Sequence, residues 1–370
     1  LVRFKHFLIY YKRNKMSYLS IKNVKIKGIA ACVPERVEYN KDYTLLPREE
    51  IDKYIQTTGV VKRHCAIHDG SMCTSDLCQK AAEKLLSDLG WDKSEIGLLL
   101  FVSQTTDYRL PSTACVLQDK MGLPNNMLAF DITLGCSGYL LGMGTAGSIM
   151  QNGTIKKALV MCGNTQSEFA SYEDRSMYLL LGDAGTVTAL EFEEDCVDIM
   201  DFSYMTDGSG RASVIVPDGG SRNPTNEKSF VMEDCGDGIR RTRLHEKMIG
   251  MDVFSFAMFN VPRNFKSLAE RINLDFEKVD YMLLHQANKF MCEKLRKKIG
   301  FPAEKCPYNI QDFGNTSGAT IPLLMVTNLA KELKEKPLTL CMTTIGVGFS
   351  LASGCIKTSG DIIVPELMYL

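Results

Sequence analysis

A cysteine at a predicted strand-to-helix junction is the strongest candidate nucleophile in the chain. Cys136 stands in the segment 130–139, whose sequence FDITLGCSGY predicts a strand, a tight turn and a glycine-rich helix. At a helix N-terminus, unpaired backbone N–H groups and the helix dipole lower a cysteine pKa from its usual value of about 8.5. We therefore expect a reactive thiolate, although a cysteine taken alone is more often a small core residue.

Two further polar residues follow segments that predict a strand and a turn. The apolar run of segment 281–288 (YMLLHQAN) leads directly to His285, one of only five histidines in the chain. Asn315 lies in a glycine-flanked turn before another predicted helix, in segment 313–322 (FGNTSGATIP). Taken alone, His285 could be a structural histidine and Asn315 a turn or cap residue. Strand ends are nevertheless where the sites of α/β proteins gather.

The elements that must position these residues alternate along the chain. Apolar runs of strand length are followed by segments of helix length, which predicts an α/β fold. The expected strands are 97–103, 127–132, 158–162, 186–192, 279–284, 338–344 and 349–356, and the expected helices are 138–150, 254–272, 289–299 and 318–330. An acidic stretch and a polar, glycine-rich stretch (191–198 and 206–237) mark a division, so we expect two halves, 16–195 and 196–370.

The composition is that of an ordinary globular protein. Hydrophobic residues make up 45% of the 370 residues and the net charge is −1, which indicates neither disorder nor a nucleic-acid footprint. The 13 cysteines are odd in number and include no C-x-x-C pair, which favours reduced thiols and a cytoplasmic protein. No run of 18 apolar residues occurs, so we expect no membrane span. Residues 1–15 hold an apolar run too short for a signal peptide, and we interpret them as an upstream extension or an artefact.

Five blocks in order along the chain resemble the motifs of the β-ketoacyl-acyl-carrier-protein synthase III family. They are the FDITLGCSGY block around Cys136, LGDAG at 181–185, HQAN at 285–288, GNTS at 314–317 and GVGF at 346–349. The resemblance implies a five-layer αβαβα thiolase fold built from two pseudo-symmetric halves, and a homodimer. It also implies a catalytic triad of Cys136, His285 and Asn315.

The resemblance implies a two-step condensation. Cys136 would take an acyl group from an acyl-coenzyme A or acyl-carrier-protein donor. Malonyl-acyl-carrier protein would then lose carbon dioxide, and His285 and Asn315 would stabilise the resulting enolate before it attacks the acyl group. The backbone N–H groups of Cys136 and Val347 would form the oxyanion hole. No cofactor is implied, since coenzyme A thioesters enter as substrates, and the pathway would be fatty acid biosynthesis.

The same resemblance suggests substrate and partner contacts. The residues expected to contact substrate are Arg175, Leu110, Gly346 and Gly348. The residues expected to dock the carrier protein are Lys294, Lys297 and Lys298, although such a cluster is often only a solvated helix face. Where family members carry a tryptophan and an arginine that hold the coenzyme A nucleotide, this chain has Lys53 and Thr57. Where a family phenylalanine is common, it has Ile345.

Several alternatives remain open at this point. Papain-like proteases share the order Cys, His, Asn, but Ser137 replaces the aromatic residue expected after their cysteine. Acyl transfer to an alcohol or amine, and thioester hydrolysis, would both use the same cysteine intermediate, and a non-catalytic homologue is a third class. A cluster of histidines and cysteines matches no usual zinc spacing, so we expect no metal there. Its members are His64, Cys65, His68, Cys73 and Cys78.

Overall fold

The computed structural model describes residues 16–370, whose strands build two large sheets. The first sheet has six strands, which in spatial order are β17 (Met368–Tyr369), β2 (Val24–Val33), β8 (Ala184–Phe192), β7 (Lys157–Asn164), β5 (Ile96–Val102) and β6 (Leu128–Ile132). The second has five, namely β1 (Ser17–Lys22), β9 (Ile199–Thr206), β16 (Ser350–Thr358), β15 (Leu338–Gly346) and β14 (Tyr281–Leu284). All seven strands expected from the sequence are present.

The two ends of the described chain each join the sheet of the opposite half. Strand β1 pairs antiparallel with β9, so the first strand belongs to the second sheet. Strand β17 pairs parallel with β2, so the last strand belongs to the first sheet. A boundary after residue 195 therefore separates the main strands of the two sheets but not these two edge strands. The interpretation of residues 1–15 lies outside the described residues.

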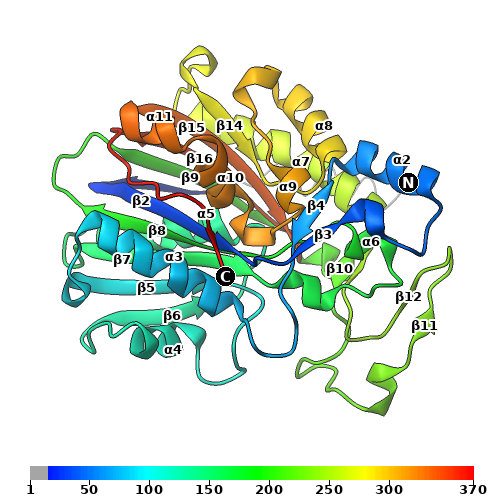
Figure 1. The fold of residues 1–370 in the computed structure, drawn as a ribbon. Coiled ribbons are helices and arrows are strands. Elements are labelled where there is room, and N and C mark those ends of the chain that lie inside the picture. The colour runs from blue at the N-terminus through cyan, green and yellow to red at the C-terminus, as the bar shows by residue number, and fades with distance from the viewer. Residues whose placement is uncertain (1–15) are drawn as a thin grey trace.

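Six helices form three layers, one between the two sheets and one on each outer face (Figure 1). The α-helices are α2 (Arg48–Thr58), α3 (Thr74–Leu89), α4 (Thr113–Lys120), α5 (Gly138–Met150), α6 (Arg175–Tyr178), α7 (Gly250–Arg271), α8 (Lys289–Ile299), α9 (Ile310–Phe313), α10 (Thr320–Asn328) and α11 (Ala330–Glu335). Helices α3 and α4 cover the outer face of the first sheet, while α7 and α8 cover that of the second. Helices α5 and α10 lie between the sheets and contact both. The expected αβαβα thiolase-like order is confirmed.

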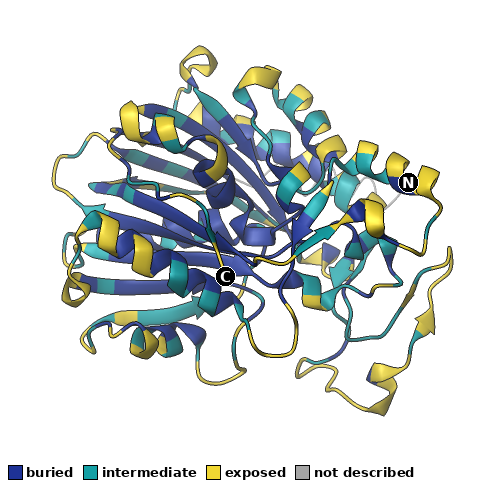
Figure 2. Cartoon of the chain, viewed as in Figure 1, coloured by how far each residue is buried: buried dark blue, intermediate teal, exposed yellow. Residues whose placement is uncertain are grey.

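Strand β5 shows why apolar runs, and not alternating patterns, mark these strands. Leu98, Leu100 and Val102 pack into the central core, whereas Leu99 and Phe101 pack into the outer cluster under α3. All five are fully buried, as Figure 2 shows for the centre of both sheets. A strand covered on both faces must be apolar at every position, which removes the period of two.

Glycines allow helix α5 to fit between the sheets. A Cβ atom at Gly142 would lie 2.9 Å from Val102 Cγ2 of the first sheet, and one at Gly147 would lie 2.8 Å from Ile21 Cγ2 of the second. The low helix propensity of glycine is therefore offset here by close approach of the helix to both sheets.

Smaller elements complete the described chain. Short ribbons pair β3 (Val37–Tyr39) with β4 (Lys62–His64), β10 (Val214–Ile215) with β13 (Lys247–Met248), and β11 (Glu233–Asp234) with β12 (Arg240–Arg241). Short 3₁₀ turns lie at Asn40–Asp42, Lys93–Glu95, Gln166–Phe169, Gly208–Gly210, Glu227–Phe230, Phe276–Lys278, Ala303–Lys305 and Ser317–Ala319. The helix expected over 318–330 is divided, because Leu329 leaves helical geometry at φ −120° with its side chain buried in the core. Within residues 16–370, each helix is too short or too polar to cross a membrane.

Candidate active site

Cys136 lies in the loop between β6 and α5, at the wall of a cavity of about 450 Å³. Its Sγ lies 3.6 Å from the hydroxyl oxygen of Ser317. Helix α5 begins only at Gly138, so the thiol precedes the first turn and does not cap it. Burial raises the pKa of Cys136 to about 11, with a smaller lowering from the Ser317 hydrogen bond. The expectation of a lowered pKa is wrong for the free protein, because loss of solvation outweighs the favourable hydrogen bond.

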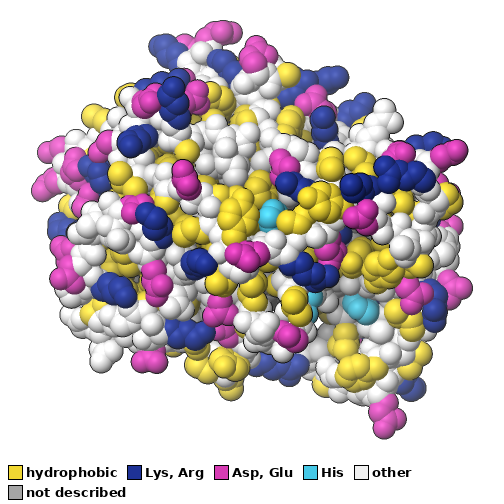
Figure 3. Space-filling model, in the orientation of Figure 1, with side chains coloured by type: hydrophobic (Ala, Val, Ile, Leu, Met, Phe, Trp, Pro, Cys, Tyr) yellow, Lys and Arg dark blue, Asp and Glu magenta, His cyan; other side chains and the backbone are white. Residues whose placement is uncertain are grey.

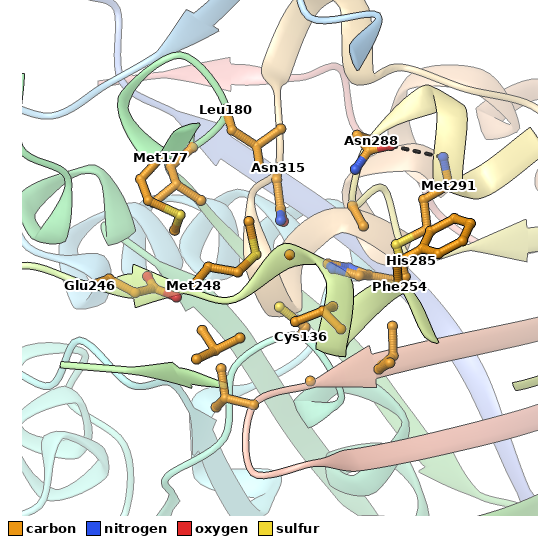
Figure 4. A pocket seen from close by; sticks show the side chains of 18 of the residues that line it. Cys136, Met177, Leu180, Glu246, Met248, Phe254, His285, Asn288, Met291 and Asn315 are labelled. Carbon is orange, nitrogen blue, oxygen red and sulfur yellow. Dashed lines mark hydrogen bonds between the residues drawn. The ribbon is translucent and has the colours of Figure 1, made fainter. Parts of the chain in front are cut away.

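His285 follows directly on strand β14 and points into the same cavity (Figure 4). Its Nδ1 lies 2.8 Å from the hydroxyl oxygen of Thr320, the first residue of α10. That oxygen is also 3.0 Å from the backbone carbonyl oxygen of Ser317. Burial lowers the pKa of His285 to about 4, so the imidazole is neutral at pH 7.

The Thr320 hydroxyl carries one proton, and this proton determines which nitrogen of His285 is protonated. When the hydroxyl donates to Ser317 O, it accepts from Nδ1–H, and Nε2 is left as an acceptor. When it donates to Nδ1, the ring proton resides on Nε2, which becomes a donor. In its two neutral tautomers the imidazole can therefore either accept or donate a hydrogen bond at Nε2, and a proton taken up there gives the imidazolium.

Asn315 reaches the cavity from a loop that is fixed by backbone hydrogen bonds. Its N–H donates to Leu180 O at 2.9 Å, and its carbonyl accepts from Gly182 N at 3.1 Å. The side-chain Oδ1 accepts the N–H of Ser317 at 2.9 Å, so the amide Nδ2 is the group directed toward Cys136 (Figure 4). The amide is thus oriented as a hydrogen-bond donor.

The LGDAG block supports this loop, and its first residue, Leu181, lines the cavity. Asp183 is fully buried and accepts hydrogen bonds from Ala66 N at 2.8 Å, Ser167 N at 2.9 Å and the Ser167 hydroxyl at 2.6 Å. It therefore fixes the chain beside Gly182, whose N–H holds Asn315.

The GVGF block borders the site from strand β15. Gly346 and Val347 line the cavity, whereas Gly348 lines an adjoining cavity of about 810 Å³. A Cβ atom at Gly346 would lie 3.0 Å from Ser137 N, so only a small residue lets β15 approach the nucleophile loop this closely. Ile345 also lines the first cavity.

The remaining cavity lining combines apolar side chains with polar ones that sequence reasoning missed. Met177, Leu180, Met248 and Phe254 provide apolar surface. The missed polar residues are Gln104, Gln166 and Glu246. They belong to short or irregular segments with no hydrophobic period, so no local signal in the sequence marks them.

Other residues predicted from the resemblance lie outside the cavity. Arg175 begins α6 and donates to the backbone carbonyl of Asp237. Leu110 is 87% exposed and does not line the cavity of its own chain. The proposed docking residues Lys294, Lys297 and Lys298 are exposed on helix α8. Lys53 and Thr57, which replace the family's nucleotide-holding residues, are exposed on helix α2. The substrate contacts of Arg175 and Leu110 and the docking contacts of the three lysines remain predictions.

The histidine and cysteine cluster has structural partners. His64 Nδ1 lies 2.6 Å from Pro34 O, and His68 Nε2 lies 2.7 Å from the Ser167 hydroxyl. Cys73 precedes helix α3, while Cys65 and Cys78 are buried. Among residues 16–370, no group of three or more His, Cys, Asp or Glu side chains is arranged to hold a metal ion.

Comparison with known proteins gives matches to a single family, both for family models and for individual relatives. Residues 130–208 match the 3-oxoacyl-[acyl-carrier-protein] synthase III family model, and residues 269–358 match the model of its C-terminal part. The β-ketoacyl-[acyl-carrier-protein] synthase III of Koribacter versatilis is 31% identical over 340 residues, covering 91% of this chain and 98% of that protein. A Phocaeicola vulgatus protein of the same name is 31% identical over 339 residues, covering 92% of this chain and 98% of its own length.

Solved structures extend the similarity to three dimensions. A 3-oxoacyl-(acyl-carrier protein) synthase from Burkholderia xenovorans LB400 matches with a TM-score of 0.89 and 38% identity, covering 96% of this chain and 99% of that one. OleA of Xanthomonas campestris shares the fold, with a TM-score of 0.73 at 19% identity over 92% of this chain and 98% of its own. With its five motifs assembled on this fold, the chain belongs to the β-ketoacyl-acyl-carrier-protein synthase III family.

Proposed function

We propose that this chain transfers an acyl group to Cys136 and condenses it with malonyl-acyl-carrier protein, giving a β-ketoacyl thioester. One observation carries the proposal: a thiol, a neutral imidazole and an oriented amide donor meet at one largely apolar cavity. Acyl transfer requires a nucleophile and a proton acceptor, and decarboxylation requires donors at the developing oxyanion. Relatives that carry this name support the same reaction.

The first step forms the acyl-enzyme. Cys136 Sγ attacks the carbonyl carbon of the donor thioester, and the carbon–sulfur bond to the leaving thiol breaks. The Cys136 proton passes to His285 Nε2 and from there to the leaving sulfur. Because the pKa of Cys136 is raised and that of His285 is lowered, neither group is ionised beforehand, and proton transfer must accompany the attack. The backbone N–H groups of Cys136 and Val347 would hold the oxyanion.

The second step makes the carbon–carbon bond. The malonyl carboxylate leaves as carbon dioxide, and its bonding electrons move onto the thioester to form an enolate. His285 Nε2–H and Asn315 Nδ2–H donate to the enolate oxygen, whose charge exceeds that of the ground-state carbonyl. The enolate carbon then attacks the acyl carbon on Cys136, the bond to Sγ breaks with its electron pair on the sulfur, and the thiolate takes up a proton to restore the thiol.

The proposed setting follows from the family and from the thiols. The donor is an acyl-coenzyme A or acyl-carrier protein, no cofactor takes part, and the active form is a homodimer. All 13 cysteines are free, which supports a cytoplasmic location. Nucleic acid and membrane have no part in the proposed reaction.

Intact-mass analysis with a panel of acyl-coenzyme A donors, followed by measurement of carbon dioxide release from malonyl-acyl-carrier protein, tests the proposal. The wild type should gain one acyl mass and then release carbon dioxide, and Cys136→Ala should gain none. Acylation without carbon dioxide release would favour transfer to an alcohol or amine, or hydrolysis. Acylation of the Cys136→Ala variant would contradict the nucleophile.

A further inference from the structure

The cavity beside Cys136 contains a buried carboxylate that the proposed reaction does not use. Glu246 is 7% exposed and lines the same cavity as Cys136 (Figure 4). None of the ion pairs among the described residues involves it. Its Oε2 instead accepts a hydrogen bond from Gln166 Nε2 at 2.8 Å. Burial raises the pKa of Glu246, with a smaller lowering from the Gln166 hydrogen bond. A buried carboxyl group without a cationic partner is costly to ionise, so its presence in a cavity wall points to a ligand.

The amide that meets this carboxylate leaves a second acceptor without a partner. Gln166 is 8% exposed, and its amide nitrogen donates to Glu246. The amide oxygen therefore faces away, and Gln166 Oε1 is buried without a hydrogen-bond partner among the described residues. A buried acceptor without a donor is costly in a native structure.

The backbone fixes both side chains in a wall between two cavities. Glu246 N donates to Phe169 O at 2.8 Å, and the next residue begins strand β13. Gln166 begins the 3₁₀ turn after β7. Both residues line the 450 Å³ cavity at Cys136 and the adjoining 810 Å³ cavity. The pair is close enough to the nucleophile that the Glu246 charge contributes to the raised pKa of Cys136.

We infer that Gln166 and Glu246 select an acyl group that carries a hydrogen-bond donor, a hydroxyl or an amine, a few atoms from its thioester carbonyl. Such a group would donate to the Glu246 oxygen that Gln166 leaves free, whereas an unsubstituted alkyl chain would cover that oxygen without giving it a donor. Met177, Leu180 and Met248 would contact the carbon atoms of the same acyl group. The inference rests on the proposed acylation of Cys136 and specifies its substrate class.

A competition between matched donors measures this selectivity. Butyryl-, 3-hydroxybutyryl- and 3-aminobutyryl-coenzyme A are mixed in equal amounts with limiting enzyme, and intact mass gives the ratio of acyl-enzymes. We expect one of the two substituted groups to load about 10- to 100-fold in excess of butyryl, the range for an unsatisfied buried polar group. Which of the two predominates shows whether the donor is a hydroxyl or an amine.

Two variants and a control assign the preference to this pair. Glu246→Leu should remove or reverse the preference, and Glu246→Gln, which keeps the shape, should reduce it. Glu270→Gln, in an exposed ion pair on the outer helix α7, should leave it unchanged. The inference would be overturned if the wild type loaded butyryl faster than the substituted groups. It would also be overturned if both Glu246 variants kept the wild-type ratio of acyl-enzymes, or if they loaded all three donors more slowly by the same factor. Failure of the wild type to load any acyl group would instead contradict the proposed function.

Discussion

At the scale of single residues, burial decides the protonation states of the proposed catalytic groups. The pKa of Cys136 is raised to about 11 and that of His285 is lowered to about 4, in both cases chiefly by loss of solvation. A thiolate–imidazolium pair is therefore disfavoured in the free protein. The site holds a neutral thiol and a neutral imidazole, and these two groups become charged only when a substrate is present.

The rate of alkylation of Cys136 tests whether the thiol is neutral in the free protein. Since only the thiolate reacts with iodoacetamide, the rate constant should rise about tenfold per pH unit from pH 7 to pH 10 without levelling off. Peptide mass mapping separates Cys136 from the exposed thiols of Cys115 and Cys235. Cys136→Ser provides the background rate. A plateau below pH 9 would show that the helix end or His285 ionises the thiol after all.

Asn315 should separate the two chemical steps. Asn315→Ala removes the oriented Nδ2 donor and the acceptor of the Ser317 N–H, while Cys136, His285 and Thr320 are unchanged. Carbon dioxide release from malonyl-acyl-carrier protein should fall by about 10²–10³, while acyl-enzyme formation followed by intact mass should persist. Wild-type release of carbon dioxide by this variant would contradict enolate stabilisation by Asn315. Thermal unfolding of the variant provides the control for its folding.

Some residues of the cavity could be predicted from the sequence and others could not, for physical reasons. Cys136, His285 and Asn315 each follow a strand or a glycine-flanked turn, and such positions have a local signature. Glu246 and Gln166 have none, because contacts between distant segments bring them to the cavity. The raised pKa of Cys136 could not be predicted from the sequence either, because it depends on how many atoms surround the sulfur.

At the scale of elements, helix α10 contributes a hydroxyl that sets the state of His285. Thr320→Val keeps the shape of the side chain but removes the hydrogen-bond partner of Nδ1. We expect condensation to slow by about 10- to 100-fold, the range for leaving one buried polar group unpaired, and Thr320→Ser to restore most of the rate. Rates of acylation and of carbon dioxide release, measured separately, check this. Equal rates for the valine and serine variants would exclude a role for the hydroxyl.

Helix α8 connects the cavity to a basic surface. Phe290 and Met291, in its first turn, line the cavity. The exposed lysines of the same helix are Lys294, Lys297 and Lys298. Figure 3 shows Lys and Arg side chains gathered over this part of the molecule. A carrier protein bound to this helix would bring its thioester close to the cavity mouth.

Charge reversal of this helix face tests the docking. Replacing Lys294, Lys297 and Lys298 with Glu should raise KM for malonyl-acyl-carrier protein and slow association, because charges at the rim of an interface act mainly on association. Acylation from coenzyme A donors should be retained. The control with the same change of charge replaces the exposed lysines of helix α11 and its end, namely Lys331, Lys334 and Lys336. Equal kinetics for the two triple variants would show that the α8 lysines are only a solvated face.

At the scale of the whole molecule, the two-sheet architecture follows from patterns that are local in the sequence. The expected strands and the bounds of α5 and α8 agree with the structure, since their apolar runs are bounded by glycine or polar residues. The exchange of β1 and β17 between the sheets was not predicted. Strands β1 and β9 pair although more than 150 residues separate them in the sequence, and the residues near either strand do not indicate which partner it takes.

The edge of the six-stranded sheet is a candidate for the proposed dimer interface. Strand β6 is its last strand, and Leu128, at its start, is 45% exposed. The loop between β5 and α4 exposes Tyr108 by 59% and Leu110 by 87%. An apolar edge strand of this kind favours pairing with another strand. A second copy placed here would bury the edge and give Leu110, which does not reach the cavity of its own chain, a neighbour to contact.

Leu128→Glu tests that interface, because a two-fold dimer would contain the substitution in both copies. In a two-fold dimer the same residue is contributed by both copies, so each variant interface would contain two carboxylates, which repel each other and lose solvation on burial. We expect the wild type to sediment as a dimer at micromolar concentration and Leu128→Glu to shift toward the monomer by at least tenfold in the dissociation constant. Val197→Glu, which changes a 76% exposed apolar residue just before β9, introduces the same charge elsewhere and should leave the dimer intact. Sedimentation velocity over a concentration series distinguishes these outcomes. A wild-type monomer would contradict the dimer itself, whereas a dimer that persists in Leu128→Glu would move the interface away from β6.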